Sequence, residues 1–200
     1  MKMKKILILT IALFATPVII AQTVTYTGAP DAIQDNDVSN PLCTSVMMPG
    51  SATVSGTNFV RVEFSVTHPW VGDLDITLQS PDATQIFLRD RATIIPVGFV
   101  GDSSNLDEGT TLSFSDTAGS AVADMGVSCD TDDVIGTAIC TEGTDFVPSQ
   151  PLSTFNGENA GGVWTLCIGD GGSGDMGILA SWSMVGDGTL PVELQSFSID

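Results

Sequence analysis

The residues of this chain that could do chemistry are mainly acidic side chains in or beside turns. Asp170 and Asp175 belong to a glycine-rich turn that runs to Gly177, and Asp73 and Asp75 share the polar face of an expected strand. Calcium takes about six to eight oxygen ligands from carboxylates and loop carbonyls, and glycine lets several carbonyls converge. The pattern predicts one or more calcium sites, with candidate ligands Asp73, Asp75, Asp116, Asp170 and Asp175. The alternative is a merely polar turn, with Asp73 bracing a hairpin through backbone hydrogen bonds.

Catalysis by a serine nucleophile is not expected. A serine protease needs an imidazole base that is oriented by a carboxylate and placed against the nucleophile. The only histidine is His68, which precedes Pro69 at the end of an expected strand, and the chain has no Gly-x-Ser-x-Gly motif. Carboxylate pairs at the separation used by glycosidases, roughly 5 to 9.5 Å, arise by chance among so many acids. We predict a partly exposed, strand-end position for His68 and no enzymatic activity.

The three tryptophans raise the question of sugar binding, because sugar faces stack on indole rings and jelly rolls host lectins. Trp164 and Trp182 lie within expected strands, where core packing is the expected use. Trp70 lies in a turn. It is the one tryptophan expected at a binding surface.

The composition excludes several classes of function. The chain has 200 residues, 24 acidic against 6 basic side chains, 42% apolar residues and a formal charge of -18. Nucleic-acid binding is excluded, because it depends on Lys and Arg releasing counterions from phosphates. Disorder is disfavoured, since the apolar share is that of a globular protein. The length fits one domain.

Residues 1–21 have the layout of a secretory signal peptide. Three lysines in the first five residues precede an almost unbroken apolar run, and the small residue Ala21 stands before Gln22. The run of about 15 residues is shorter than the roughly 20 that span a bilayer. We expect cleavage before Gln22, a secreted or cell-surface location in a bacterium, and no membrane span in the mature chain. The mature chain then has three arginines and 24 acidic side chains, so its negative charge must be well solvated or neutralised by bound cations.

Four cysteines, at positions 43, 129, 140 and 167, all lie in the exported part. An even number in an oxidising compartment favours two disulfides, and four cysteines can pair in three ways. We favour Cys129 with Cys140, which closes a short loop, and Cys43 with Cys167, which ties an early strand to a late one. The chain has no CxxC motif or Cys/His cluster, so a zinc site of the usual kind is not expected.

The elements that must hold these residues are strands and turns. Residues 58–67 and 73–79 alternate apolar with polar side chains, which is the period-two pattern of half-buried strands. The second run continues through a turn at 80–83 into 86–88 as a hairpin. Further elements are expected as strands at 110–114, 163–168 and 178–185, the last with Ile178, Ala180, Trp182 and Met184 on one face, and as a short helical turn within 149–156. This pattern predicts an all-β sandwich or jelly roll.

Two blocks of the sequence resemble a known family. Residues 68–81, His-Pro-Trp-Val-Gly-Asp-Leu-Asp-Ile-Thr-Leu-Gln-Ser-Pro, resemble the signature hairpin of the P domain, or Homo B domain, which follows the subtilisin-like catalytic domain of proprotein convertases. The second block comprises Phe146–Pro148, Pro151–Ser153, Phe155–Gly157, Gly162–Leu166, Gly174–Leu179 and Ser181–Ser183. The resemblance runs from about residue 29 to residue 186 and is greatest to bacterial P domains.

The resemblance implies a jelly-roll β-sandwich of the galactose-binding-like type with about eight strands. It also implies an accessory role, because in the convertases this domain packs against the protease domain, supports its folding and influences its calcium and pH dependence. The P domain is not itself known as a hydrolase. Similarity to calcium-binding bacterial P domains and jelly rolls strengthens the calcium prediction.

The last residues carry a further resemblance. Leu-Pro-Val-Glu-Leu at 190–194 is similar to the segment that opens the region before C-terminal sorting domains in proteins exported by Bacteroidetes-type bacteria. We divide the chain into a signal peptide (1–21), a P-type domain (22–186) and a tail (187–200). The predicted function is a secreted accessory module that docks on a serine endopeptidase or another surface protein. The alternative is a calcium-dependent carbohydrate-binding or adhesin module on the same fold, with Trp70 at its binding site.

Overall fold

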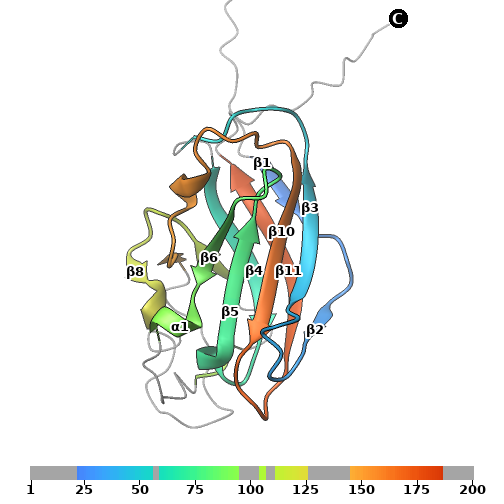
Figure 1. The fold of residues 1–200 in the computed structure, drawn as a ribbon, viewed down its shortest axis with the longest axis vertical. Coiled ribbons are helices and arrows are strands. Elements are labelled where there is room, and N and C mark those ends of the chain that lie inside the picture. The colour runs from blue at the N-terminus through green and yellow to red at the C-terminus, as the bar shows by residue number, and fades with distance from the viewer. Residues whose placement is uncertain (1–21, 56–58, 95–103, 107–110, 126–144, 187–200) are drawn as a thin grey trace, which may run out of the picture.

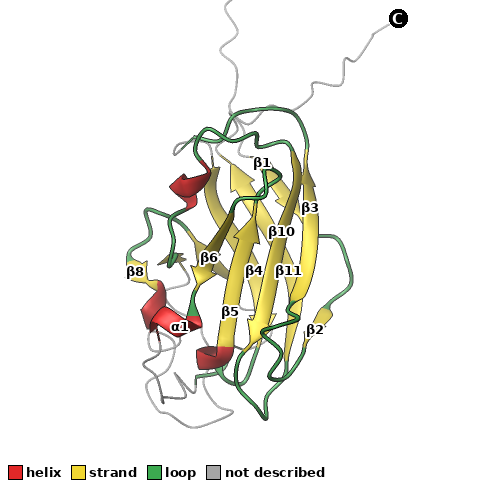
Figure 2. Ribbon diagram, in the orientation of Figure 1, coloured by secondary structure: helices red, strands yellow, loops and turns green. Residues whose placement is uncertain are grey.

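The structure, a computed structural model, describes residues 22–55, 59–94, 104–106, 111–125 and 145–186. In this part of the chain two β-sheets pack face to face (Figure 1), and helical residues are confined to short turns (Figure 2). The predicted all-β sandwich is confirmed. It has eleven strands in the described ranges, more than the about eight that the resemblance implies.

The larger sheet has seven strands in the order β1-β11-β4-β7-β9-β8, and β2 also pairs with β11. Its strands are β1 (Gln22–Thr25), β2 (Asp31–Ile33), β4 (Phe59–Thr67), β7 (Thr111–Phe114), β8 (Ser120–Ala121), β9 (Asp145–Val147) and β11 (Gly177–Gly186). The smaller sheet has four antiparallel strands in the order β3-β10-β5-β6. They are β3 (Leu42–Met48), β10 (Gly162–Asp170), β5 (Leu74–Gln79) and β6 (Gln85–Arg89).

The helical segments are one or two turns long at most. They are α1 (Arg91–Ile94) and three 3-10 turns, Val71–Asp73, Val122–Asp124 and Leu152–Phe155. The last of these confirms the helical turn expected within 149–156. None of the helices in the described ranges is long and apolar enough to cross a membrane.

Alternation along the strands fills the space between the sheets with apolar side chains. The hairpin of β5 and β6 is confirmed, and β5 buries Leu74, Ile76 and Leu78 on one face. From the other sheet, Phe64 of β4 stacks on Phe114 of β7 with 5.3 Å between ring centres. Burying such a side chain completely contributes about 1.5–3 kcal/mol, so this layer holds the sandwich together.

Trp164 and Trp182 belong to this layer, as predicted, with 0% and 1% of their surface exposed. Trp164 packs edge-on against Phe155, and its indole N–H donates to the Ala160 carbonyl at 2.7 Å. The indole N–H of Trp182 donates to the Thr44 hydroxyl at 2.9 Å, which links β11 to β3 across the core. Both buried N–H groups therefore have partners.

The predicted inward face of β11 is wrong at its beginning. Leu179 is buried and Ile178 is 47% exposed, whereas Trp182 and Met184 are buried as expected. The pairing of β11 with β4 shifts between Leu179 and Ser181. An extra residue at such a bulge reverses which side chains face inward, and the period-two pattern of the sequence does not reveal it.

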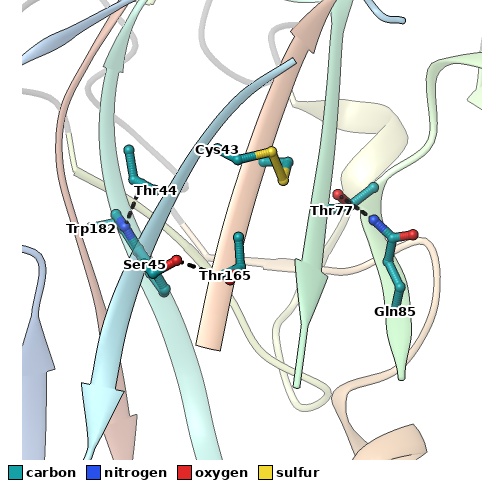
Figure 3. The surroundings of a disulfide bond; sticks show 8 residues. Cys43, Thr44, Ser45, Thr77, Gln85, Thr165 and Trp182 are labelled. Carbon is teal, nitrogen blue, oxygen red and sulfur yellow. Dashed lines mark hydrogen bonds between the residues drawn. A yellow bond between two sulfur atoms is a disulfide. The ribbon is translucent and has the colours of Figure 1, made fainter. Parts of the chain in front are cut away.

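A disulfide joins the edge strand β3 of the smaller sheet to its neighbour β10. Cys43 of β3 and Cys167 of β10 lie directly opposite each other and are bonded (Figure 3), as predicted. Their side chains lie on the outer face of the sheet, beside the Ser45–Thr165 hydrogen bond of 3.0 Å. Cys129 and Cys140 lie outside the described residues, so their predicted pairing stays a prediction.

The strand register brings four strand ends together at one end of the sandwich. Asp170 of β10 lies opposite Leu74 of β5, and Arg89 of β6 lies opposite Ile76. His68 follows the last residue of β4 at the same end, where it contacts Asp170. This end is the lower one in Figure 1, where β10 turns into β11, and β1 pairs with the last residues of β11 at the opposite end.

Candidate functional site

A polar pocket of about 350 Å³ opens at the lower end of the sandwich. We call it the end pocket. Its walls come from the segment between β2 and β3, the connection from β4 to β5, the start of α1 and the loop from β10 to β11. The residues that line it are Asn36, Trp70, Asp73, Arg91, Gly171, Gly172, Ser173 and Asp175.

Local hydrogen bonds and glycines position these walls. The Gly171 N–H donates to the Asp73 carbonyl at 2.8 Å, and the Gly174 N–H donates to the Asp35 carboxylate at 2.9 Å. A Cβ at Gly172 would lie 1.9 Å from Oδ2 of Asp73, so only glycine lets this loop approach the carboxylate so closely. The glycine-rich turn singled out in the sequence is thus one wall of the end pocket.

Asp73 is the buried acidic residue of this pocket, with 5% of its surface exposed. Its Oδ1 lies 3.5 Å from Nη2 of Arg91. Burial raises the pKa of the Asp73 carboxyl above its ordinary value, as do the nearby charges of Asp170 and Asp175, whereas Arg91 and His68 act in the opposite direction. Negative charge therefore remains incompletely compensated around Asp73.

Arg91 is fixed in the pocket by three groups. Its Nε–H donates to the Gly72 carbonyl at 3.1 Å, its backbone N–H donates to Asp75 at 2.6 Å, and its guanidinium faces Asp73. No motif of the sequence singles out this residue. The available signal was composition, because Arg91 is one of three basic side chains after residue 21 in a chain with 24 acidic ones.

His68 and Asp170 form a buried pair directly behind the pocket. The prediction of a partly exposed His68 is wrong, since 1% of its surface is exposed, and its Nε2 lies 3.2 Å from Oδ2 of Asp170. The other oxygen of Asp170 accepts the Gly172 N–H at 2.8 Å. Nδ1 of His68 lies 3.1 Å from the backbone nitrogen of Trp70 and 2.8 Å from its carbonyl oxygen. Both ring nitrogens of His68 therefore have partners at this end of the sandwich.

The other two predicted metal ligands lie elsewhere. Asp75, half-buried on β5, lines a separate hollow of about 280 Å³ on the outer face of the smaller sheet. Burial raises its pKa, and the N–H of Arg91 opposes that rise. Asp116 accepts the N–H groups of Leu152 and Ser153 at 2.6 and 2.8 Å, so it caps the 3-10 turn that begins there.

The predicted calcium ligands are thus only partly brought together. Asp73 and Asp175 line the end pocket with Trp70, and Asp170 lies behind them. Within the described ranges no group of three or more His, Cys, Asp or Glu side chains is placed to hold a metal ion. Both oxygens of Asp170 already accept hydrogen bonds. Asp73 and Asp175 can offer oxygens to a cation here, and the remaining ligands that calcium takes would have to be backbone carbonyls or water.

The fold and the end pocket together define an all-β sandwich module with a polar site at one end. The family model of the proprotein convertase P-domain matches residues 57–116, which include the His68–Pro81 motif, Asp73 and Arg91. The resemblance inferred from the sequence is confirmed over this segment. The matched segment includes β4, β5, β6 and β7, and it contains the residues of two walls of the end pocket.

Two solved structures are also similar to the chain. One is a serine protease of Aeromonas sobria in complex with a chaperone, with 19% identity and a TM-score of 0.48. The other is the serine protease of the same organism, with 20% identity and a TM-score of 0.46. Each comparison covers 84% of this chain and 26% of the other, so the chain spans about a quarter of those proteins. The curated proteins contain no match.

Proposed function

We propose that this chain is a secreted, non-catalytic accessory module that docks on a serine endopeptidase. The observation that carries the proposal is the match of residues 57–116 to the proprotein convertase P-domain. The described geometry supports a non-catalytic role, because both ring nitrogens of His68, the only histidine, are committed to Asp170 and to the backbone of Trp70.

The surface that best fits a protein partner is the outer face of β3 and β10. We call it the neutral face and define it by its outward side chains, Cys43, Ser45, Met47, Val163, Thr165 and Cys167. None of these six is charged, although the chain carries a formal charge of -18. Met47 and Val163 lie opposite each other and are 63% and 47% exposed. Interface centres are depleted in charge and enriched in Met, so a docking partner can cover this face without desolvating carboxylates.

The docking proposal is tested by capture of an active protease. The mature chain, tagged and immobilised, is incubated with exported proteins of the source bacterium that have been treated with a fluorophosphonate, which labels active serine hydrolases. We expect retention of a labelled subtilisin-like protease, and we expect Met47→Asp with Val163→Asp to reduce it about tenfold, because two desolvated carboxylates would lie at the interface.

The matched control is Met176→Asp, since Met176 is exposed to a similar extent, 57%, and lies in the β10–β11 connection. This variant should retain the protease as well as the unchanged chain does. Absence of any labelled serine protease, or equal loss in the control, would overturn the proposal. Turnover of casein or a fluorogenic peptide by the purified chain that disappears in His68→Ala would overturn the non-catalytic role.

Secretion and calcium binding are parts of the same proposal. Residues 1–21 are the proposed signal peptide, and mass spectrometry of the exported protein should find Gln22 at its N-terminus. Calcium would stabilise the module at the end pocket, where Asp73 and Asp175 would bind it. The bound ion would offset the repulsion between these two carboxylates. An exported protein that still carries residues 1–21 would contradict the first of these statements.

A further inference from the structure

The end pocket has the size and lining of a site for a small organic ligand. Its volume of about 350 Å³ lies within the range of ligand pockets, roughly 300–1,000 Å³. Its lining residues offer several kinds of side chain. They are the indole of Trp70, the guanidinium of Arg91, the carboxylates of Asp73 and Asp175, the amide of Asn36 and the hydroxyl of Ser173. The question is which chemistry fits this mixture.

When the pocket holds no metal ion, its charges disfavour a charged organic ligand. An anion would face the carboxylates of Asp73 and Asp175, with that of Asp170 behind them. A cationic side chain would face the guanidinium of Arg91, which the Gly72 carbonyl and Asp73 hold in place. A neutral ligand with several hydroxyl groups avoids both repulsions, because each hydroxyl can donate to a carboxylate or accept from the guanidinium.

Trp70 supplies the apolar surface that such a ligand also needs. Its side chain is half-buried and lines the pocket, whereas the other two tryptophans are buried in the core. The C–H face of a sugar ring can cover an indole while its hydroxyls reach the polar walls. The geometry points to a carbohydrate-binding site in the end pocket, in which a neutral sugar ring stacks on Trp70 and hydrogen-bonds to Arg91, Asp73 and Asp175. This function goes beyond docking on a protease and does not depend on it.

The wall that carries Trp70 is held in place before any ligand arrives. The backbone nitrogen and carbonyl of Trp70 both lie within hydrogen-bond distance of His68, and His68 is anchored by the fully buried Asp170. Taking two polar side chains out of water is unfavourable even when they contact each other, so the buried contact between His68 and Asp170 is a poor device for stability alone. A preorganised wall lowers the entropy lost on binding, so the contact between His68 and Asp170 would favour ligand binding.

Asp73 keeps capacity to accept hydrogen bonds from a ligand. It is more than nine-tenths buried and lines the pocket. Its partner among the described side chains is Arg91, and the 3.5 Å between Oδ1 and Nη2 exceeds an ordinary hydrogen bond. In the pocket without calcium, a sugar hydroxyl beside Asp73 and Asp175 would donate to a carboxylate that water alone reaches poorly.

The test uses defined polysaccharides as probes. The mature chain is applied to affinity gels that contain neutral polymers (β-glucan, xylan, mannan and soluble chitin oligomers), a polyanion (alginate) and a polycation (polylysine). We expect at least one neutral polymer to retard the chain. Alginate and polylysine should change its mobility only through their charge. Iodide quenching of tryptophan fluorescence is measured in parallel, because Trp70 is the accessible indole among the three.

Four substitutions separate binding from folding. Trp70→Ala should weaken binding about tenfold, the loss expected for one aromatic stacking contact, and Trp70→Phe should restore part of it. Asp175→Asn should weaken binding several-fold, and Met47→Asp, on the neutral face, should leave it unchanged. The near-ultraviolet circular dichroism of the buried Trp164 and Trp182 reports whether each variant is folded.

The outcomes decide the proposal. Retardation by a neutral polymer that falls in Trp70→Ala, together with protection of Trp70 from iodide by the same polymer, supports it. Retardation by no neutral polymer, by alginate or polylysine alone, or to the same extent in Trp70→Ala would overturn it. Because protease capture depends on the neutral face, failure here leaves the docking result unaffected.

Discussion

The neutral face and the end pocket are surfaces of opposite character on one small sandwich. The neutral face is uncharged and partly apolar, and it is fastened by the disulfide between Cys43 and Cys167. The end pocket is rich in ionisable groups. All four buried ionisable side chains in the described ranges lie at this end of the sandwich, namely His68, Asp73, Arg89 and Asp170.

The contrast indicates two kinds of recognition. An uncharged face suits a macromolecule that excludes water over a wide area. A concave site with donors, acceptors and one indole suits a small polar ligand. Buried charges are expensive unless they are well paired, so their concentration at one end indicates that this end is shaped for binding, while the apolar layer around Trp164 and Trp182 provides the stability.

The largest expected effect comes from breaking the pair behind the end pocket. Asp170→Ala should lower the free energy of unfolding by about 3–5 kcal/mol, because it leaves two groups, the buried His68 ring and the Gly172 N–H, without their partner. Urea denaturation measures the loss. The double variant Asp170→Leu with His68→Phe should be more stable than Asp170→Ala. A double variant that is less stable than Asp170→Ala would contradict the view that this pair serves binding more than stability.

Much of the fold could be predicted from the sequence, because strand alternation and turn composition are local. The hairpin after Asp73 and the buried Trp164 and Trp182 follow from such patterns. The Cys43–Cys167 bond is favoured among three pairings because the exported chain has an even number of cysteines. The site could be predicted only in part. The bulge after Leu179 is invisible in a period-two pattern, and the positions of His68 and Arg91 depend on which strand ends meet across the sandwich.

The second largest effect concerns the neutral face. Replacing the disulfide by Cys43→Ser with Cys167→Ser should cost about 2–4 kcal/mol, because the unfolded chain regains freedom over a separation of 124 residues. Urea denaturation again measures the change. Iodide quenching of Trp70 should be unaltered, since the bond and the end pocket are separate. An altered quenching would show that the two surfaces are coupled.

Calcium should produce the third effect, and it should act at the end pocket. At a calcium concentration about 100 times the dissociation constant, the native state gains about 2.7 kcal/mol, or several degrees in melting temperature. Differential scanning calorimetry in calcium and in EGTA measures the shift, and Asp175→Asn should reduce it. An identical melt in both buffers would remove calcium from the account, and an unchanged shift in Asp175→Asn would move the ion away from this pocket.

The smallest effect lies at neither surface and serves as a reference. Tyr26, the only tyrosine, donates to Asp31 at 3.0 Å, and this hydrogen bond raises the pKa of the Tyr26 hydroxyl above 10.0. The hydrogen bond supports the fold fully below the unfolded-state pKa, and this support is lost as the pH rises through the higher folded-state pKa. Ultraviolet titration of the phenolate should give a midpoint above 10.0 that falls toward 10.0 in Asp31→Ala. Equal midpoints would contradict the hydrogen bond.

The division of labour between the two surfaces is tested most directly by capture of the fluorophosphonate-labelled protease on two variants side by side. Trp70→Ala should retain the protease as the unchanged chain does, and Met47→Asp with Val163→Asp should retain about a tenth as much. Loss of the protease in Trp70→Ala with full retention in the double variant would contradict the account, because it would place the protease at the end pocket and leave the neutral face without a role.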